Sequence, residues 1–204
     1  MFPTIGNISK VDQPLNGTAR VEPSDARLIP FKGKAPRLGE GCFLADTARL
    51  VGDVVIGPRS SIWFGAVIRG DVFHVRIGAR VNIQDMALIH VTAEKHPTLV
   101  GDDVTIGHRA TLHGCTVGRG ALIGMGATIL DEARIGAHAM VGAGALVTPG
   151  SVIEEGTLWT GVPARFRREL RASEREHLAR SAPHYCKLAQ VYLDAGFGRV
   201  GTAT

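Results

Sequence analysis

A six-residue repeat of aliphatic side chains restricts the folds open to this 204-residue chain more than any other feature. From Val117 to Ile153 an Ile or Val returns at every sixth position, and the same step recurs from Leu38 to Leu112 with interruptions. A period of six drifts around an α-helix of about 3.6 residues per turn, so the repeat does not describe an amphipathic helix. It predicts a β-solenoid in which each hexapeptide contributes one short strand and one corner.

Strand alternation assigns a direction to each position of the hexapeptide. The aliphatic residue and the residue two before it should point inward, and the residue after it should point outward. Small residues such as Ala110 and Ala127 come two before Leu112 and Ile129, which leaves room for the larger side chains. Three hexapeptides should close one triangular coil, stacked on the next at roughly 4.8 Å.

The step of six is broken at three places. Ile68 to Ile77 is nine residues, Ile89 to Val100 is eleven, and Leu112 to Val117 is five. We interpret the first two breaks as loops at corners of the coil. Binding and catalytic residues are often found on loops of a rigid scaffold, so these two breaks indicate a functional site beside them. The alternative interpretation is that they are insertions without a function.

Three histidines lie close to these breaks. His90 and His113 each follow an aliphatic residue and are separated by three hexapeptides, so they should stack on one outer face in adjacent coils. Arg69 belongs to the same column, one coil below. His108 falls at the corner of a different face, with Asp85 one coil below it.

Three imidazoles with one open position are typical of a hydrolytic zinc centre. One chain would have to reach around a corner to bring His108 to the other two, whereas a neighbouring chain can present it directly. Repeated about a threefold axis, this predicts a homotrimer with metal sites at the subunit interfaces. Imidazole also suits Fe²⁺ and Co²⁺. Cys115 is a possible fourth ligand, but a buried corner thiol is the favoured interpretation.

At this point the chain resembles the γ-class carbonic anhydrase family of hexapeptide-repeat proteins, over residues 28–195. The matching runs are VIRGD (67–71), IGARVNIQD (77–85), the histidine at 90, VTIGHRATLHGC (104–115) and LIGMGATILD (122–131). The resemblance implies an all-β fold, a left-handed parallel β-helix with a C-terminal helix. It also implies zinc ligands His90 and His113 from one subunit and His108 from the next.

The same resemblance implies a zinc-dependent lyase that hydrates CO₂ reversibly to bicarbonate and a proton. The residues that match the family's ligand- and substrate-positioning side chains are Arg69, Asp71, Asn82, Gln84 and Asp85. Gln84 is expected to orient the attacking oxygen. Arg69 either holds bicarbonate or pairs with Asp85 or Asp71.

The chain differs from the family prototype in the residues that would carry the released proton to solvent. The prototype has a glutamate after the motif aspartate and a long acidic loop, whereas here Val72 follows Asp71 and the loop is the short TAEKHP (92–97). Glu94 and His96 are the substitutes in that loop, and His74 lies nearby. We therefore expect Glu94 to be catalytic and proton export to limit turnover.

Two other functions share the same fold. One is a metal-binding trimer without significant turnover, and the other is a hexapeptide-repeat acyltransferase with an acyl donor and a single catalytic histidine. Fold analogy does not separate them. An acyltransferase would not require three histidines at metal-ligand positions.

The ends of the chain fall outside the repeat. We expect a flexible arm over residues 1–27, the β-helix over 28–160, a helix over 161–195 that opens near Pro163 and packs on the β-helix, and a tail over 196–204.

Charge and composition exclude several classes of function. The net charge is +4, and arginine alternates with glutamate over residues 163–180, which is typical of a solvated helix and not of a nucleic-acid surface. No run reaches the length of a membrane span, and the start lacks an apolar signal-peptide centre. Three cysteines without a CxxC pair fit a reducing compartment. These features predict a cytoplasmic protein without nucleic-acid or membrane partners.

Overall fold

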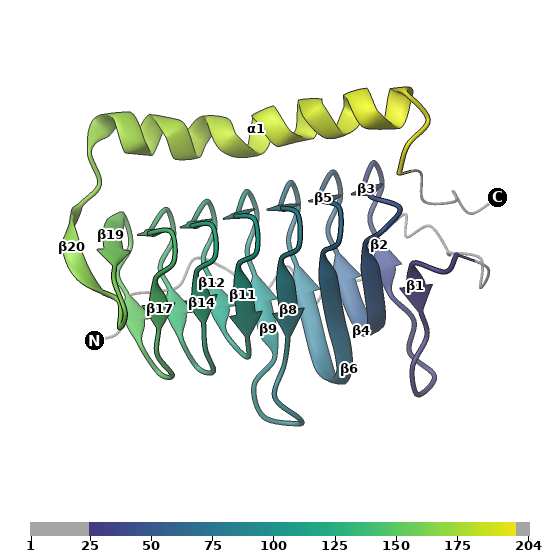
Figure 1. Ribbon diagram of the computed structural model, residues 1–204, viewed down its shortest axis with the longest axis horizontal. Helices are drawn as coiled ribbons and strands as arrows, with labels where there is room; N and C mark the ends of the chain where they lie inside the picture. The colour runs from purple at the N-terminus through teal and green to yellow at the C-terminus, as the bar shows by residue number, and fades with distance from the viewer. Residues whose placement is uncertain (1–24, 199–204) are drawn as a thin grey trace.

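The computed structural model describes residues 25–198 as a parallel β-solenoid with one helix along its side (Figure 1). Most of the predicted arm and tail lies in residues 1–24 and 199–204, outside the described residues. The strands are β1 (Leu28–Ile29), β2 (Arg37–Leu38), β3 (Phe43–Leu44), β4 (Arg49–Ile56), β5 (Ser61–Ile62), β6 (Val67–Ile77), β7 (Asn82–Ile83), β8 (Leu88–His90), β9 (Thr98–Val100), β10 (Thr105–Ile106), β11 (Thr111–His113), β12 (Thr116–Val117), β13 (Leu122–Ile123), β14 (Thr128–Ile129), β15 (Arg134–Ile135), β16 (Met140–Val141), β17 (Leu146–Val147), β18 (Val152–Ile153), β19 (Thr157–Thr160) and β20 (Arg165–Glu169), followed by helix α1 (Ala172–Asp194).

The strands form three faces, and from β7 to β16 each strand pairs with the third one after it. The first face contains β8, β11, β14 and β17, the second contains β9, β12, β15 and β18, and the third contains β3, β5, β7, β10, β13, β16 and β19. Ile89 lies opposite Leu112, and Leu112 lies opposite Ile129, all in parallel register. The prediction of three hexapeptides per coil is confirmed.

The repeating aliphatic residues fill the interior of the tube. Leu112 and Ile129 are fully buried, and so are Ala110 and Ala127 two positions before them. Cys115 also points inward and is 1% exposed, and burial raises the pKa of its thiol to about 12. Cys115 therefore fills the core and is not placed as a metal ligand.

The first break in the repeat is not a loop. β6 runs without interruption through the expected loop, because β4 pairs with it on both sides of the corner, from Arg49 opposite Val67 to Ile56 opposite Ile77. β4 pairs with Val67–Gly70 and with Val75–Ile77, which holds both ends of β6 in the sheet, and the register shifts at the corner between them. The second break is a loop as predicted, closed by a bridge between Thr92 and His96.

The helix begins later than predicted. Pro163 lies in the turn between β19 and β20, and α1 begins at Ala172. The residues between them pair antiparallel with β19 and cover the open edge of the last coil, which would otherwise present unpaired backbone groups. The side chain of Glu174 accepts from the backbone N–H of Arg171 at 2.8 Å and closes the first turn of the helix.

Helix α1 then runs back along the third face toward the first coils (Figure 1). Its main strand contacts are with β3, β5 and β7, and Leu178, Ala182 and Ala189 are the buried residues of the helix. Within residues 25–198, no helix has the length and apolar character that a membrane span requires.

Candidate metal centre

His90 and His113 lie side by side on the first face, as their spacing predicts. They end β8 and β11 and are directly opposite each other in the parallel register. Nδ1 of His90 is 3.2 Å from Nε2 of His113. The first face therefore brings two imidazole nitrogens together at one corner of the coil.

A carboxylate holds the outer nitrogen of each of these two rings. Asp71 Oδ1 lies 3.1 Å from His90 Nε2, and Asp131 Oδ1 lies 2.6 Å from His113 Nδ1. When each ring donates its N–H to its carboxylate, the two remaining nitrogens carry lone pairs that face each other. Two like lone pairs repel unless a cation lies between them. Carboxylate–histidine pairs of this kind orient ligands in metal sites.

The distance between the two facing nitrogens also fits a shared metal ion. Nitrogens bound at about 2.0–2.1 Å to one tetrahedral zinc are about 3.3 Å apart. The observed 3.2 Å between His90 and His113 is close to that value. The residues present at this corner thus fit two ligands of one zinc ion.

Burial and charge keep His90 in the neutral form that a metal ligand needs. Burial lowers the pKa of His90 and outweighs the hydrogen bond to Asp71, and the nearby charge of Arg69 lowers it further. Arg69 itself donates to Asp71 Oδ2 at 2.5 Å. Of the two ion pairs considered for Arg69, the structure therefore contains the one with Asp71.

Asp131 is the residue at this corner that our sequence reasoning missed. Burial raises its pKa, but hydrogen bonds from Thr92 and His113 lower the pKa more, so the carboxylate stays ionised. The bond from Thr92 Oγ1 is 2.6 Å long. The stacking rule that placed Arg69 below His90 puts Asp131 one coil above Gly114, and this step upward would have identified it.

His108 lies at a different corner, between the third and first faces. Its Nδ1 is 2.9 Å from Asp85 Oδ2, and its backbone N–H donates to Gln84 Oε1 at 3.2 Å. Gln84 Nε2 donates to Asn82 Oδ1 at 3.0 Å, and Asn82 Nδ2 donates to Thr105 Oγ1 at 2.9 Å. Asn82 and Gln84 are buried, so this chain of bonds fixes both side chains.

The predicted site residues thus form two groups within one chain. Arg69 and Asp71 accompany His90 and His113, whereas the second group is Asn82, Gln84, Asp85 and His108. In the part of the chain that the structure describes, no three His, Cys, Asp or Glu side chains converge so that they could hold a metal ion. A site with three imidazoles would need both groups.

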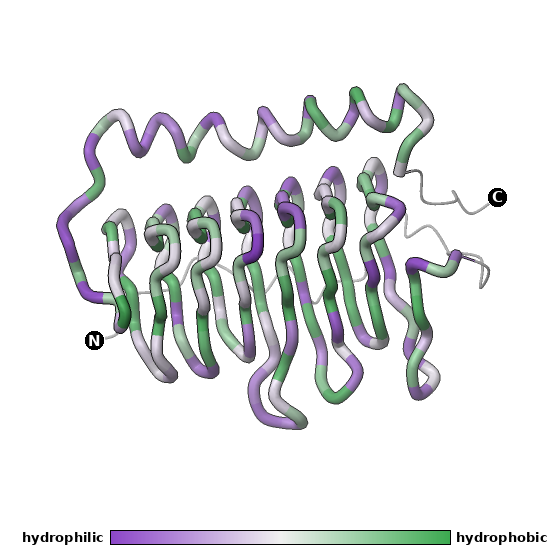
Figure 2. The backbone as a smooth tube through the Cα atoms, viewed as in Figure 1, coloured by the Kyte–Doolittle hydropathy of each residue, from purple (hydrophilic) through white to green (hydrophobic). Residues whose placement is uncertain are grey.

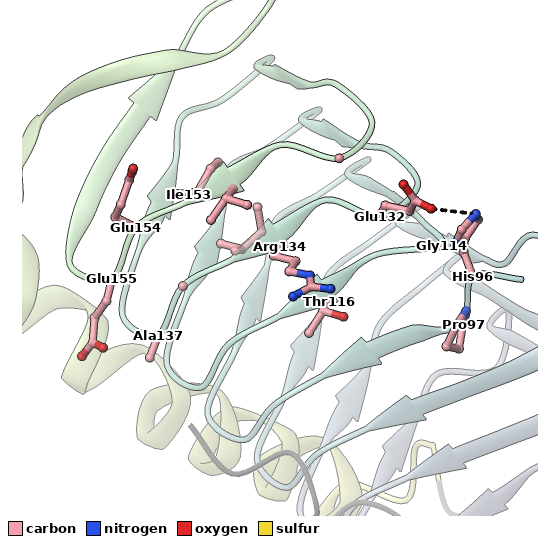
Figure 3. A pocket seen from close by; sticks show the side chains of 14 residues that line it. His96, Pro97, Gly114, Thr116, Glu132, Arg134, Ala137, Ile153, Glu154 and Glu155 are labelled. Atoms are coloured by element: carbon pink, nitrogen blue, oxygen red, sulfur yellow. Dashed lines mark ion pairs between the residues drawn. The ribbon is translucent and has the colours of Figure 1, made fainter. Parts of the chain in front are cut away.

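The loop after His90 places its two candidate proton carriers differently. Glu94 is exposed at the tip of the loop. His96 is half-buried, and its Nε2 lies 3.4 Å from Glu132 Oε1. Figure 3 shows this pair at one end of a groove of about 640 Å³ on the second face, beside Gly114.

The family model that matches this chain describes the repeat. It is the bacterial transferase hexapeptide (six repeats), matched over residues 97–131. A putative acetyltransferase from Bacillus cereus of known structure is 45% identical, covers 81% of this chain and 95% of its own, and superposes with a TM-score of 0.79. The fold is the left-handed β-helix of hexapeptide-repeat proteins, as predicted.

Curated relatives carry a more specific name. Gamma carbonic anhydrase 2, mitochondrial, from Arabidopsis thaliana is 42% identical over 93% of this chain and 74% of its own length. A carbonic anhydrase from Geobacillus kaustophilus is 46% identical over 81% of this chain and 90% of its own length. The chain spans 60% and 64% of the length of two further Arabidopsis gamma carbonic anhydrases.

Proposed function

The chain belongs to the gamma carbonic anhydrase family, and we propose that it catalyses the reversible hydration of CO₂ to bicarbonate and a proton as a zinc-dependent homotrimer. The observation that carries this proposal is the pair His90 and His113, whose facing nitrogens are 3.2 Å apart while carboxylates hold the opposite nitrogens. Family membership implies a metal in general; zinc, with Fe²⁺ or Co²⁺ as alternatives, is the proposed ion.

The third ligand in this proposal is His108 of a second copy of the chain. His108 lies at a corner where Asp85 pairs with it, away from the other two histidines. A threefold arrangement would bring each His108 corner against the next chain's His90 and His113 and would close without leaving an open interface. The trimer would hold three equivalent sites.

The side chains around the ligands have separate tasks in this mechanism. Asp71 and Asp131 fix which nitrogen of each ring is protonated and keep the rings in place. Arg69 acts through Asp71, since it donates to the carboxylate that holds His90. Zinc, when bound, supplies a Lewis acid that makes water a nucleophile near neutral pH.

Gln84 is the side chain suited to orient a reacting oxygen. Its Oε1 accepts from the His108 backbone, and one N–H donates to Asn82. An amide nitrogen has two donors, so one N–H of Gln84 remains for an oxygen atom at the interface. Because Gln84 is 6% exposed and held at both ends, that donor is preorganised.

Proton export is proposed to run through His96 and Glu132. His96 lies next to Gly114, beside the Asp131 carboxylate that holds His113, and its Nε2 faces Glu132. An imidazole is a suitable relay near neutral pH. Glu94, predicted as catalytic, is exposed and stays a candidate for the last transfer to solvent.

Metal analysis combined with stopped-flow CO₂ hydration tests the function. We expect one zinc per chain and hydration activity that is lost with a chelator and restored by zinc. Bound metal without measurable hydration would support the alternative of a metal-binding trimer. No bound transition metal after expression with added metal would contradict the proposal.

Mixed trimers test the shared site. His108→Ala and His90→Ala should each be inactive, but their mixture should regain part of the activity, because some interfaces then combine an intact His90 with an intact His108. Mixed trimers, verified by mass spectrometry, that stay inactive would contradict a shared site.

Acyl transfer is the alternative from another class, and the structural similarity to a putative acetyltransferase favours it. It predicts release of free thiol from an acyl-CoA with an amine acceptor, independent of metal. The same purified sample should show CO₂ hydration and no such release. The cytoplasmic location stays a prediction, since three relatives are named mitochondrial.

A further inference from the structure

A second groove lies between helix α1 and the third face of the solenoid. It has a volume of about 680 Å³, within the range of small-molecule sites. Strands β10, β13 and β16 form its floor, and the first half of α1 forms its roof. At one end it reaches Gln84 and His108, but the rest extends away from the proposed metal centre.

The helix face above this groove changes character along its length. His177, Arg180, Ser181 and His184 line the groove at spacings of three and four, so they lie on one face of the helix. Figure 2 shows the first half of α1 as mostly hydrophilic and the second half as richer in hydrophobic residues.

Over the first coils that helix face is aromatic and packs tightly. Tyr192 lies 5.2 Å from Trp63 and 5.4 Å from Phe43 between ring centroids, and Tyr185 lies 5.9 Å from Trp63. A helix that packs directly on strands buries an apolar stripe. The polar stripe over β10, β13 and β16 contacts the floor through one hydrogen bond, between Ser181 Oγ and Thr105 Oγ1 at 2.6 Å, and the groove lies beside this contact.

The floor of the groove is apolar where the roof is basic. Leu122, Met125 and Met140 line the solenoid side. Gly107 and Gly142 line it as well and project no side chains.

The charge of the groove is one-sided. Its basic or titratable groups are His108, His177, Arg180 and His184, and no aspartate or glutamate is among the described residues that line it. Arg180 pairs with Glu176 at 2.6 Å, but both side chains are more than half exposed, so that pair is weak and exchangeable.

We propose that this groove binds a carboxylate with an aliphatic tail. The tail would lie on Leu122, Met125 and Met140, and the carboxylate would face Arg180 and the helix histidines. A neutral molecule would not compete with Glu176 for Arg180, and a small inorganic anion would leave the apolar floor uncovered. The site goes beyond the proposed hydration of CO₂ and does not depend on it.

Methionine methyl NMR can test the site directly. Of the chain's four methionines, Met125 and Met140 line the groove, and Met86 is not among its lining residues. With ¹³C-methyl methionine, octanoate should shift the Met125 and Met140 signals saturably and leave the Met86 signal unchanged. Octanol and acetate should bind at least about 10-fold more weakly, as expected when one charge-assisted or one apolar contact is lost.

Charge reversal supplies the matched comparison. Arg180→Glu should weaken octanoate binding by about 10-fold or more. Arg134→Glu makes the same change in the groove of Figure 3 and should leave the binding unchanged. Both positions are exposed, so both variants should fold, which thermal melting can verify.

Three results would overturn the proposal. The first is the absence of a saturable shift at Met125 and Met140, which is also what a second copy filling the groove would produce. The second is equal binding of octanol and octanoate. The third is an Arg180→Glu variant that binds octanoate like the unmodified protein. None of these readouts involves hydration activity or zinc.

Discussion

The coils before Cys115 and the coils after it are built from the same repeat but carry different tasks. Residues 117–153 keep the step of six at every strand, whereas residues 38–113 contain the first two breaks, with the continuous corner strand β6 and the loop over 92–97. His90, His108 and His113 all belong to the irregular coils. The regular coils contribute Asp131, which holds His113.

This difference shows how a solenoid accommodates a site. Parallel stacking places equivalent positions one above another, so two histidines one coil apart meet although the loop over 92–97 lies between them in the chain. A carboxylate, however, has to approach each ring from the side. The extended corner of β6 brings Asp71 to His90, and a residue of the next coil reaches His113.

The largest expected effect is loss of the metal when His113 is replaced, compared with replacement of the equivalent residue one coil later. His113→Ala should abolish metal binding and hydration. Loss of only an outer carboxylate typically costs about 10–100-fold in metal affinity, so loss of the imidazole should cost more. Leu130→Ala, at the same repeat position one coil later, should keep one zinc per chain. Elemental analysis and stopped-flow hydration measure both variants. Equal metal loss in the two would mean that the histidine is structural.

Two glycines with positive φ, one in each region, allow the effect of a side chain on metal affinity to be separated from its effect on stability. Gly114 has φ +57° and a Cβ there would collide with the Asp131 carboxylate, whereas Gly126 has φ +67° and open space around it. Gly126→Ala should cost about 1 kcal/mol of unfolding free energy and nothing in metal affinity. Gly114→Ala should also displace Asp131 and weaken metal binding by about 10–100-fold.

Metal titration and denaturant unfolding of the two glycine variants check this prediction. Unchanged metal affinity in Gly114→Ala, with stability reduced as in Gly126→Ala, would show that Asp131 does not need its observed position.

Substitutions in the loop over 92–97 should lower the turnover number and leave metal binding unchanged. His96→Ala should lower kcat by up to about 10²-fold, the lower end of the range for general acid–base groups, and added imidazole should restore part of it. Glu94→Ala should have a smaller effect, because Glu94 is exposed while His96 faces Glu132. Hydration rates at several buffer concentrations measure both. If the turnover number of the unmodified protein does not depend on buffer concentration, proton export is not the limiting step.

Acid should loosen the irregular coils before the regular ones. Burial raises the pKa of Asp53 and of Asp103, but hydrogen bonds from Arg76 and Lys34 and from Arg80, respectively, leave each pKa below its usual range. A carboxylate with a lowered folded-state pKa stabilises the fold above about pH 4, and this stabilisation is lost as the pH falls through the folded-state value.

The two tryptophans report this difference separately. Trp63 lies in the irregular coils and Trp159 in the last strand of the third face. In the single-tryptophan variants Trp159→Phe and Trp63→Phe, fluorescence should change at a higher pH for Trp63 than for Trp159. Coincident transitions would mean that the solenoid unfolds as one unit.

Much of the site geometry could be predicted by counting hexapeptides. The stacking of His90 on His113 and of His108 over Asp85 followed from the repeat, and both are observed. The ligand roles of these histidines, and the functions of Arg69 and Gln84, stay predictions. The helix start near Pro163 was wrong, because strand pairing with β19 competes for those residues.

The sequence by itself determined which residues fill the tube, which face each histidine occupies and how many hexapeptides close a coil. These properties follow from local strand alternation repeated at a constant step, so they need no knowledge of distant contacts. Only the tertiary structure decided that β6 continues through its corner, that Asp131 holds His113, and that α1 packs on the first coils while leaving a groove over β10, β13 and β16. Each of these depends on pairing or packing between residues far apart in the chain, where several local conformations are possible and the partner selects one.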